Sequence, residues 1–246
     1  MLRRAGVVGD PAGHSLSPAI HRAGYAANGL DWAYAAYTVA PSELEGFVGE
    51  RIDDPAWAGL SVTAPHKEAI LAFGEADEPT RLLGAGNTLV FGARGARVFN
   101  TDVPGFVRAW RAHGLSAPRS AAILGNGATA RSILLALAGL GVTDVTFLAR
   151  RPERAVEILD LASILGVRAA VRSLDEGVDA VDVVANTIPA AATAPHAPAL
   201  ARAARVVFDA VYDPWLDQAN LPVRCCAAVE LGHPDLKVEI IITAAL

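Results

Sequence analysis

The sequence predicts an α/β protein of two domains, an N-terminal domain with a mixed sheet and a C-terminal domain with a doubly wound sheet. Three observations predict this fold. Strand-like and helix-like segments alternate along most of the chain. From Ser120 onward the strand-like segments are apolar throughout, which is typical of parallel strands covered by helices on both faces. The length of 246 residues also allows two modest hydrophobic cores.

The first part of the chain alternates between the two periodicities. Strands are expected at residues 5–9, 32–39 and 59–64, and two short strands at 87–92 and 96–101 flank the turn-like "GARG". Helices are expected from about Pro18 to Asn28, from residue 41 in "PSELEGF", over 65–73 in "PHKEAILAF" and over 102–114 in "DVPGFVRAWRAHG". The hinge-like "LSAPRS" follows, so the domain boundary is expected near residues 103–118.

The second part consists of regular βαβ units. Strands are expected in "AAILG", "DVTFLAR", "VRAAV", "VDVVANT" and "ARVVFDAVY", with helices in "GATARSILLALAGL" and "PERAVEILDLASILG". We therefore expect one domain over residues 1–104 and a second over 105–229. Residues from about 230 to 246 are expected to return to the first domain.

Composition narrows the class of partner. A formal net charge of −5 and a pI near 5.7 give no electrostatic reason to expect nucleic acid or an anionic membrane as partner, so a small molecule is favoured. The two cysteines, Cys225 and Cys226, are adjacent, which suits neither an ordinary disulfide nor a metal site. We find no targeting segment or membrane span in the sequence, and we expect a cytoplasmic protein without a metal.

A glycine-rich turn opens the second domain. In "AAILGNGATAR", two glycines and an alanine have the spacing of the dinucleotide-binding fingerprint between a strand and a helix. Glycine permits a tight turn and lets backbone N–H groups approach a diphosphate at a helix N-terminus. An ordinary tight connection is the alternative, but the context favours a Rossmann-type cofactor site. Its expected contacts are Gly125, Asn126, Gly127, Ala128, Thr129 and Ala130.

The end of the next strand indicates which dinucleotide binds. Arg150, Arg151 and Arg154 lie where an NAD-selective site would carry an acidic residue for the ribose hydroxyls. Guanidinium groups suit a 2′-phosphate, and basic side chains are not what a helix dipole favours at an N-terminus. A solvated basic surface is the alternative. The cluster favours NADP over NAD.

Polar residues of the first domain gather at the ends of predicted strands. They are Ser15 and Ser17 in "GDPAGHSLSPAIH", Thr63 and Lys67 in "SVTAPHK", Asn87 in "GAGNTL", and Thr101 and Asp102 in "FNTD". In open α/β sheets the carboxyl ends of strands face the ligand, so these residues are expected to converge. Hydroxyl, amide, ammonium and carboxylate groups together suit a polyhydroxylated, carboxylated small molecule.

From about residue 6 to residue 214 the sequence resembles the shikimate dehydrogenase family. The motifs that carry the resemblance are "GDPAGHSLSPAIH", "GLSVTAPHK", "GAGNTL", "NTDVPGF", "LGNGATAR" and "VVFDAVYDP", in the family's order and close to its spacing. The resemblance implies a two-domain enzyme that interconverts 3-dehydroshikimate and shikimate with NADP(H) in aromatic amino-acid (chorismate) biosynthesis. We expect a monomer or a homodimer.

The resemblance also implies roles for individual residues. Ser15 and Ser17 would bind the substrate carboxylate, and Thr63, Asn87 and Asp102 its ring hydroxyls. Lys67 and Asp102 would form the catalytic pair, because a ketone reduced by hydride needs a proton on its oxygen. The resemblance places "NTIP", with Thr187 and Ile188, beside the nicotinamide. Tyr212 is a candidate substrate contact for a different reason, its position at the end of the strand-like "FDAVY", with core packing as the equal alternative.

Alternatives remain for these residues and for the function. Lys67 could be a solvated residue of a helix's first turn, and Ser17, which precedes Pro18, could cap a helix. The rival functions are a quinate or aminoshikimate dehydrogenase using NAD(P), and a non-catalytic dinucleotide-binding homologue. Where the family carries a closing helix with a substrate-contacting glutamine, "KVEIIITAAL" has a β-branched character that does not favour a helix.

Overall fold

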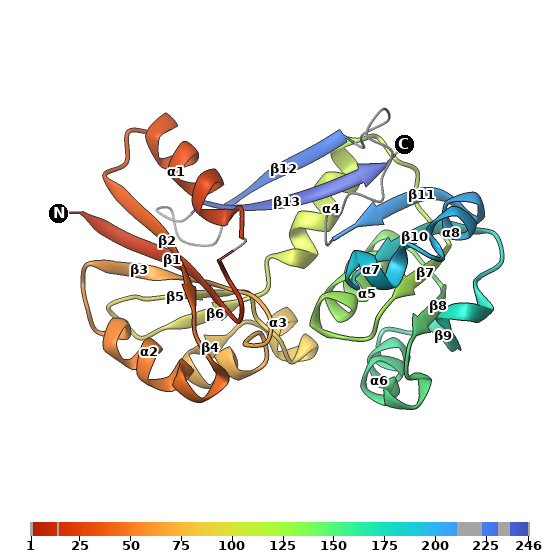
Figure 1. Cartoon of the computed structure of the whole chain (residues 1–246), viewed down its shortest axis with the longest axis horizontal. Coiled ribbons are helices and arrows are strands. Elements are labelled where there is room, and N and C mark those ends of the chain that lie inside the picture. The colour runs from red at the N-terminus through yellow and green to blue at the C-terminus, as the bar shows by residue number, and fades with distance from the viewer. Residues whose placement is uncertain (1, 14, 211–222, 231–236, 246) are drawn as a thin grey trace. The chain divides into compact units, whose positions relative to one another are not determined.

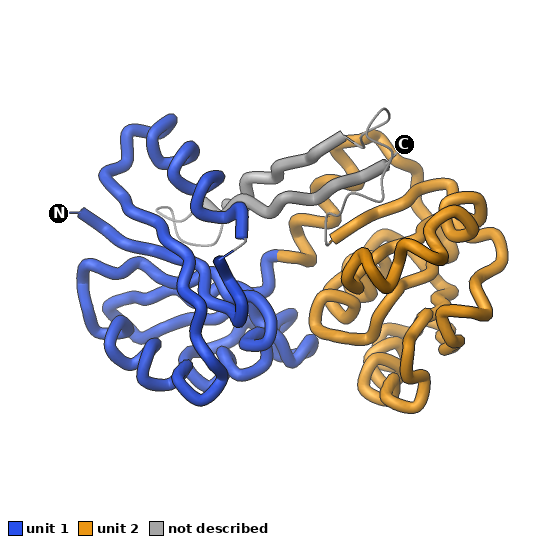
Figure 2. Tube along the Cα trace, in the orientation of Figure 1, with its two compact units in different colours: residues 1–101 blue, residues 102–246 orange. Residues whose placement is uncertain are grey.

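The alternating segments fold into two compact units, each with its own sheet. The computed structural model describes residues 2–13, 15–210, 223–230 and 237–245, the last two ranges by their backbone (Figure 1). The units comprise residues 1–101 and 102–246 (Figure 2). The division falls at the start of α4 (Asp102–Ala112), just before the expected boundary at residue 104. It falls there because α4 packs against α5 (Ala128–Leu140) of the second unit.

The first unit contains a six-stranded mixed sheet in the order β2-β1-β3-β5-β6-β4. Its strands are β1 (Arg3–Gly9), β2 (Trp32–Thr38), β3 (Trp57–Val62), β4 (Glu75–Ala76), β5 (Thr88–Val90) and β6 (Arg97–Phe99). The neighbours β2, β1 and β3 are parallel, whereas β5 runs antiparallel to β3 and β6. The mixed sheet is as the sequence predicts.

Helices cover both faces of this sheet. They are α1 (Ser17–Ala27), η1 (Pro41–Glu43), α2 (Leu44–Ile52), η2 (Ala69–Phe73) and α3 (Glu78–Leu83). On one face, Val48 of α2 and Ile70 of η2 pack with Leu60 of β3 in the main core. On the other face, Tyr25 of α1 packs with Val7 and Tyr34. Alternate residues of β1 therefore enter opposite cores.

Two segments of the first unit differ from the predicted elements. The helix expected over 65–73 is a series of turns followed by the short 3₁₀ helix η2, because the chain must first bend at Pro65 as it leaves β3. The short helix α3 has no counterpart among the predicted elements. Its sequence signals were present, since Asp77 accepts a hydrogen bond from the Thr80 amide at 3.0 Å and Gly84 ends the helix in the left-handed conformation.

The second unit is doubly wound. Its parallel strands are β7 (Ser120–Leu124), β8 (Asp144–Ala149), β9 (Arg168–Ser173), β10 (Val181–Asn186) and β11 (Ala204–Asp209), in the sheet order β11-β10-β7-β8-β9. The connecting helices are α5, η3 (Pro152–Arg154), α6 (Val156–Ile164), η4 (Leu174–Glu176), α7 (Ala190–Thr193) and α8 (Ala197–Ala203). The strand order reverses between β7 and β10, which is where ligands bind in such sheets.

Both faces of the central strand β7 are buried, as its apolar sequence predicts. Ala122 and Leu124 of β7 pack with Leu200 of α8 on one face. Ala121 and Ile123 are also almost fully buried and, by the alternation of a strand, face the other side. Across the residues that the structure describes, none of the helices is long and apolar enough to cross a membrane.

The described part of the tail is strand rather than helix. Residues Val223–Glu230 form β12 and Lys237–Ala245 form β13, which pair with each other in antiparallel fashion. β13 also pairs antiparallel with β11, so this segment extends the second sheet instead of returning to the first domain as expected. The β-branched run "KVEIIIT" explains the preference for a strand.

Candidate active site

Two of the predicted substrate residues, Thr63 and Asn87, lie at the carboxyl end of β3. The Thr63 amide, just after β3, donates to the carbonyl of Val8 in β1 at 2.9 Å. The Val62 amide donates to the carbonyl of Asn87 at 2.7 Å, and the Asn87 amide donates to the carbonyl of Phe99 at 2.9 Å. These three bonds fix four chain segments, distant in sequence, at one edge of the sheet, as the strand-end pattern predicts.

The side chain of Asn87 has a fixed orientation. Its Oδ1 accepts from the Thr101 amide at 2.9 Å, from the Thr101 hydroxyl at 3.0 Å and from the Thr88 hydroxyl at 3.0 Å. Because a backbone N–H can only donate, Oδ1 rather than Nδ2 must face Thr101. The amide nitrogen of Asn87 therefore faces the opposite way. Thr101 is 1% exposed and supports Asn87; the sequence pattern predicts it among the converging polar residues but gives it no role.

Lys67 lies on the loop that leaves β3, next to this asparagine. Its backbone carbonyl accepts from the Gly86 amide at 2.7 Å, so the Lys67 loop is tied to the residue before Asn87. The side chain is half-buried. Asp102 directly follows Thr101 and is the first residue of α4. The structure therefore brings Thr63, Lys67, Asn87 and Thr101 together, and chain connectivity puts Asp102 one residue away.

His66 holds this loop from beneath. Its side chain is 1% exposed, and Nε2 forms a 2.7 Å hydrogen bond with the carbonyl of Val39 at the end of β2. The residue is structural, and no group of three or more metal-binding side chains occurs among the described residues.

Ser15 and Ser17 follow β1 at the same edge of the sheet. The Ser17 amide donates to Oγ of Ser15 at 3.3 Å. Helix α1 begins at Ser17, Leu16 occupies the N-cap position, and no side chain makes a capping bond there. The hydroxyl of Ser17 is therefore not used for capping, which removes the alternative that its position before Pro18 suggested.

Next to Ser17 lies an aromatic group, Tyr34 with His21, that the sequence analysis does not name among the site residues. Tyr34 of β2 is 4% exposed, and the ring of His21 stacks on it with the centroids 4.0 Å apart. His21 Nδ1 also bonds the carbonyl of Ser17 at 2.8 Å. Burial raises the pKa of the Tyr34 phenol, and the adjacent Ser61 and Ser17 side chains oppose that rise. Only the strand assignment of "WAYAAYT" could have located this tyrosine.

The glycine-rich turn of the second unit follows β7 at the point where the strand order reverses. Gly125 has φ +100°, and a Cβ there would lie 2.7 Å from Oγ1 of Thr187 and 2.8 Å from Cγ2 of Ile188. Thr187 is held by its amide, which donates to the carbonyl of Leu124 at 3.1 Å. Gly125 is thus required by the backbone, and the predicted residues after β10 lie against the turn.

Gly127 differs, because the protein itself does not require a glycine there. It is the N-cap residue of α5, has φ −86°, and a Cβ at this position would meet no atom within 4 Å. No side chain caps the helix at this residue. An open approach to a helix N-terminus fits the diphosphate of a dinucleotide, because a residue without a Cβ lets the diphosphate come close to the backbone N–H groups.

The predicted arginines lie after β8, beside that turn. Arg150, Arg151 and Arg154 are all exposed. Asn126 donates from Nδ2 to the carbonyl of Arg154 at 3.0 Å, which joins the glycine-rich turn to η3. Exposed guanidinium groups beside an uncapped helix N-terminus fit a dinucleotide with an additional phosphate. Tyr212 lies outside the described residues.

A doubly wound unit with a glycine-rich turn, joined to a separate α/β unit with a polar strand edge, defines a two-domain dinucleotide-dependent dehydrogenase. A family model described as the shikimate dehydrogenase substrate binding domain matches residues 7–89. Shikimate dehydrogenase (NADP(+)) of Moorella thermoacetica is 36% identical over 85% of this chain and 75% of its own length. The chain belongs to the shikimate dehydrogenase family.

Solved structures agree with this assignment. The crystal structure of Mycobacterium tuberculosis shikimate dehydrogenase has 41% sequence identity and a TM-score of 0.75, over 87% of this chain and 80% of that one. Shikimate 5-dehydrogenase from Thermus thermophilus, in complex with NADP(H) and shikimate, has 33% identity and a TM-score of 0.67, over 76% and 68% of the two chains. The predicted family and fold class are confirmed.

Proposed function

We propose that this protein catalyses the reversible, NADP-dependent reduction of 3-dehydroshikimate to shikimate in aromatic amino-acid biosynthesis. The related proteins of Moorella thermoacetica and Acidiphilium cryptum are both named shikimate dehydrogenase (NADP(+)), and the second is 38% identical over 86% of this chain. This kinship supports the predicted function, the oxidoreductase class and the cofactor.

One structural observation carries the proposal within the molecule. The loop of Lys67 is bonded to Gly86, and the neighbouring Asn87 has its carboxamide oriented by Thr101. An ammonium, a fixed amide donor and the hydroxyl-bearing Thr63 are therefore presented at one strand edge. A pure nucleotide-binding protein has no physical need for this arrangement in a separate unit.

The polar edge suits a substrate with several hydroxyls and one carboxylate. We assign Thr63, Asn87 and Asp102 to the ring hydroxyls, because together they offer donors and acceptors. We assign Ser15 and Ser17 to the carboxylate, since the Ser17 hydroxyl is not used in helix capping and lies at the start of α1, where the helix dipole favours an anion. Tyr212 remains a proposed substrate contact.

Lys67 is the proposed proton donor. When bound, NADPH supplies the hydride that reduces the ketone. As the carbonyl carbon gains that electron pair, the C=O π pair moves to oxygen, and the Lys67 ammonium transfers a proton to this oxygen. The Asp102 carboxylate holds the ammonium and accepts from the new hydroxyl. In the reverse direction, neutral Lys67 takes the hydroxyl proton.

The second unit supplies the proposed cofactor contacts. The backbone from Gly125 to Ala130, which includes Asn126, Ala128 and Thr129, would surround the diphosphate. Arg150, Arg151 and Arg154 would bind the 2′-phosphate, and Thr187 with Ile188 would contact the nicotinamide half. The open approach at Gly127 supports this assignment.

A spectrophotometric assay tests the proposal. Purified protein is offered shikimate or quinate, each with NADP or NAD, and reduced nicotinamide is followed by its absorbance. We expect rapid reduction of NADP with shikimate and much slower reduction in the other three pairs. Faster turnover of quinate would indicate the rival substrate. No turnover with any pair, despite NADP binding by calorimetry, would indicate a non-catalytic homologue.

Two further expectations about the whole protein stay proposals. We propose that it acts in the cytoplasm, because the adjacent spacing of its two cysteines does not suit an ordinary structural disulfide. We also propose a monomer or homodimer that binds no nucleic acid, in keeping with the net charge of −5. Light scattering coupled to gel filtration measures the oligomeric state.

A further inference from the structure

Asn126 connects the two turns to which the cofactor contacts are assigned. Its Nδ2 donates to the backbone carbonyl of Arg154 at 3.0 Å, across 28 positions of sequence. Asn126 lies between Gly125 and Gly127 in the glycine-rich turn, and Arg154 is the last residue of η3. A side chain that itself belongs to the diphosphate turn therefore fixes the backbone of the arginine-bearing turn.

A second bond fixes the same region from the other end. Nη1 of Arg131 in α5 lies 2.9 Å from Oε2 of Glu157, the second residue of α6. The Arg131 side chain is 8% exposed and that of Glu157 is 81% exposed. The 3₁₀ helix η3 lies between these two bonds in sequence, and its own turn is formed by the 3.0 Å bond from the Arg154 amide to the Arg151 carbonyl. The arginine turn is thus held on both sides, by the glycine-rich turn and by α5.

We infer that Asn126 is a positioning residue that sets the selectivity for NADP over NAD. The inference rests on the proposed function, and it concerns only how the 2′-phosphate is recognised. The two cofactors share their diphosphate and differ only in that phosphate, so a bond that places Arg154 affects only the binding of NADP. Asn126 is partly exposed, so water can replace its bond and the fold should tolerate its loss.

Two nucleotides separate this role from a general one. Adenosine 2′,5′-bisphosphate carries the 2′-phosphate of NADP, whereas 5′-AMP lacks it. Binding of both is measured by titration calorimetry for the wild-type protein and for Asn126→Ala, Arg154→Ala and the double variant. Asn28→Ala is the matched control, because Asn28 Nδ2 donates to the Gly24 carbonyl at 2.8 Å, an exposed asparagine-to-backbone bond of the first unit.

We expect the variants to differ in which nucleotide they bind less tightly. Asn126→Ala weakens binding of the bisphosphate about fivefold and leaves binding of 5′-AMP unchanged, as expected for one lost hydrogen bond. Arg154→Ala lowers the affinity for the bisphosphate about tenfold or more, since a charge-assisted contact is lost. The double variant binds no more weakly than Arg154→Ala, because Asn126 acts through that arginine. Asn28→Ala binds both nucleotides like wild type.

Other results would overturn the inference. One is that Asn126→Ala lowers the affinity for both nucleotides equally, and another is that it changes neither affinity. A third is that the losses of binding free energy of the two single variants simply add in the double variant. The proposed function is judged separately, by whether the wild-type protein reduces NADP with shikimate. A wild-type protein that discriminates the nucleotides but does not turn over shikimate would contradict the proposed function and leave the role of Asn126 supported by its own measurements.

Discussion

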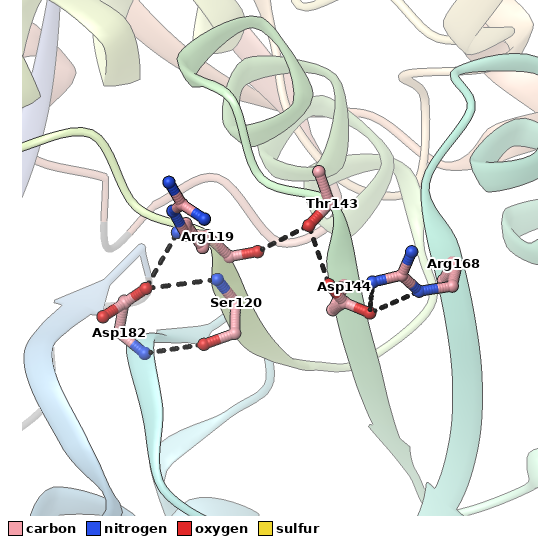
Figure 3. Close-up of polar contacts among 6 residues, drawn as sticks. All are labelled: Arg119, Ser120, Thr143, Asp144, Arg168 and Asp182. Carbon is pink, nitrogen blue, oxygen red and sulfur yellow. Dashed lines mark hydrogen bonds and ion pairs between the residues drawn. The ribbon is translucent and has the colours of Figure 1, made fainter.

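The two ends of the parallel strands in the second unit differ in whether side chains accept hydrogen bonds from nearby backbone N–H groups. At the amino ends, Oδ2 of Asp182 accepts from the amides of Arg119 and Ser120 at 2.8 and 3.3 Å, and Oγ of Ser120 accepts from the Asp182 amide at 3.1 Å (Figure 3). At the carboxyl ends, α5 begins at Gly127 without a side-chain cap. The protein itself completes the amino end, whereas the carboxyl end is where we propose that the cofactor diphosphate binds.

The amino end contains a second polar group of the same kind. Oγ1 of Thr143 donates to Asp144 Oδ2 at 2.7 Å, and Arg168 forms two 2.7 Å bonds with the same carboxylate (Figure 3). These side chains connect β8 and β9 at their first residues. Stability and binding are therefore assigned to opposite edges of one sheet, and substitutions at each edge should affect one property and spare the other.

The largest expected effect is at the carboxyl edge of the first unit. Lys67→Ala should lower kcat about 10³-fold, because the proposed proton donor is lost. The bond from the Gly86 amide to the Lys67 backbone carbonyl should remain, since alanine keeps that carbonyl, so the free energy of unfolding should stay well above zero. Steady-state kinetics and urea unfolding measure the two quantities.

Lys67→Arg is the matched control for that substitution. It keeps a positive charge but not a titratable proton donor, because a guanidinium remains protonated in proteins. We expect kcat to stay low in this variant. Wild-type kcat in either variant would contradict the assignment of Lys67.

A carboxylate like that of Asp182 can be placed at the opposite edge of the sheet by substitution. Gly127→Asp places a carboxylate at the N-cap of α5, where no protein atom lies within 4 Å of the new Cβ. The free energy of unfolding should be unchanged or rise by about a few tenths of a kcal/mol, the difference between aspartate and glycine as N-caps. NADP should bind about 100-fold more weakly, since the carboxylate repels the diphosphate and takes its N–H donors.

Gly125→Ala is the contrasting variant for the glycine-rich turn. Its φ of +100° and the 2.7 Å approach of Thr187 Oγ1 make any side chain unfavourable, so this variant should lose stability as well as binding. Thermal unfolding and calorimetric titration of NADP compare the two. If Gly127→Asp bound NADP as well as wild type does, the turn would not be the diphosphate site.

A smaller effect is expected at the amino edge. Asp182→Ala removes the acceptor of the Arg119 and Ser120 amides, which should cost about 1–2 kcal/mol of unfolding free energy. The KM values for shikimate and NADP should not change, because the residue lies at the opposite end of the strands. Loss of activity without loss of stability would show that the two edges are not independent.

The strands and turns could be predicted from the sequence because the residues that form them have strong local conformational preferences. The apolar strands, the turn at Gly125 and the strand-end position of Asn87 follow from periodicity and glycine spacing. The candidate site residues of the first unit can be predicted because several hydroxyl and amide groups at neighbouring strand ends are seldom needed for structure alone. Their roles came from family resemblance, because strand-end position alone does not distinguish a substrate contact from a support such as Thr101.

The remaining features depend on contacts between distant segments. Tyr34 lies beneath Ser17 only because β2 pairs with β1, and nothing in "WAYAAYT" marks its neighbour. The bond from Asn126 to Arg154 joins residues separated by α5 and β8. The unit boundary at residue 102 follows from the packing of α4 on α5, which helix periodicity does not reveal. Pairing and packing of this kind are set by the whole fold.

The finest test of the comparison is its dependence on pH. The backbone amide of Arg119, and then that of Ser120 with the Arg205 guanidinium, hold the pKa of the Asp182 carboxyl below its ordinary value of 3.8. A carboxyl whose pKa is lower in the folded state contributes stability above its unfolded pKa, and this contribution is lost as pH falls through the folded pKa.

The Tm difference between wild type and Asp182→Asn should therefore be constant from about pH 5 to about pH 8 and shrink below about pH 4. Asp144→Asn should follow the same course with a smaller difference, because the Arg168–Asp144 pair is largely exposed and screened by solvent. A Tm difference for Asp182→Asn that grew on acidification would mean that the carboxylate destabilises the folded state, and the amino edge would then not be the stabilising one.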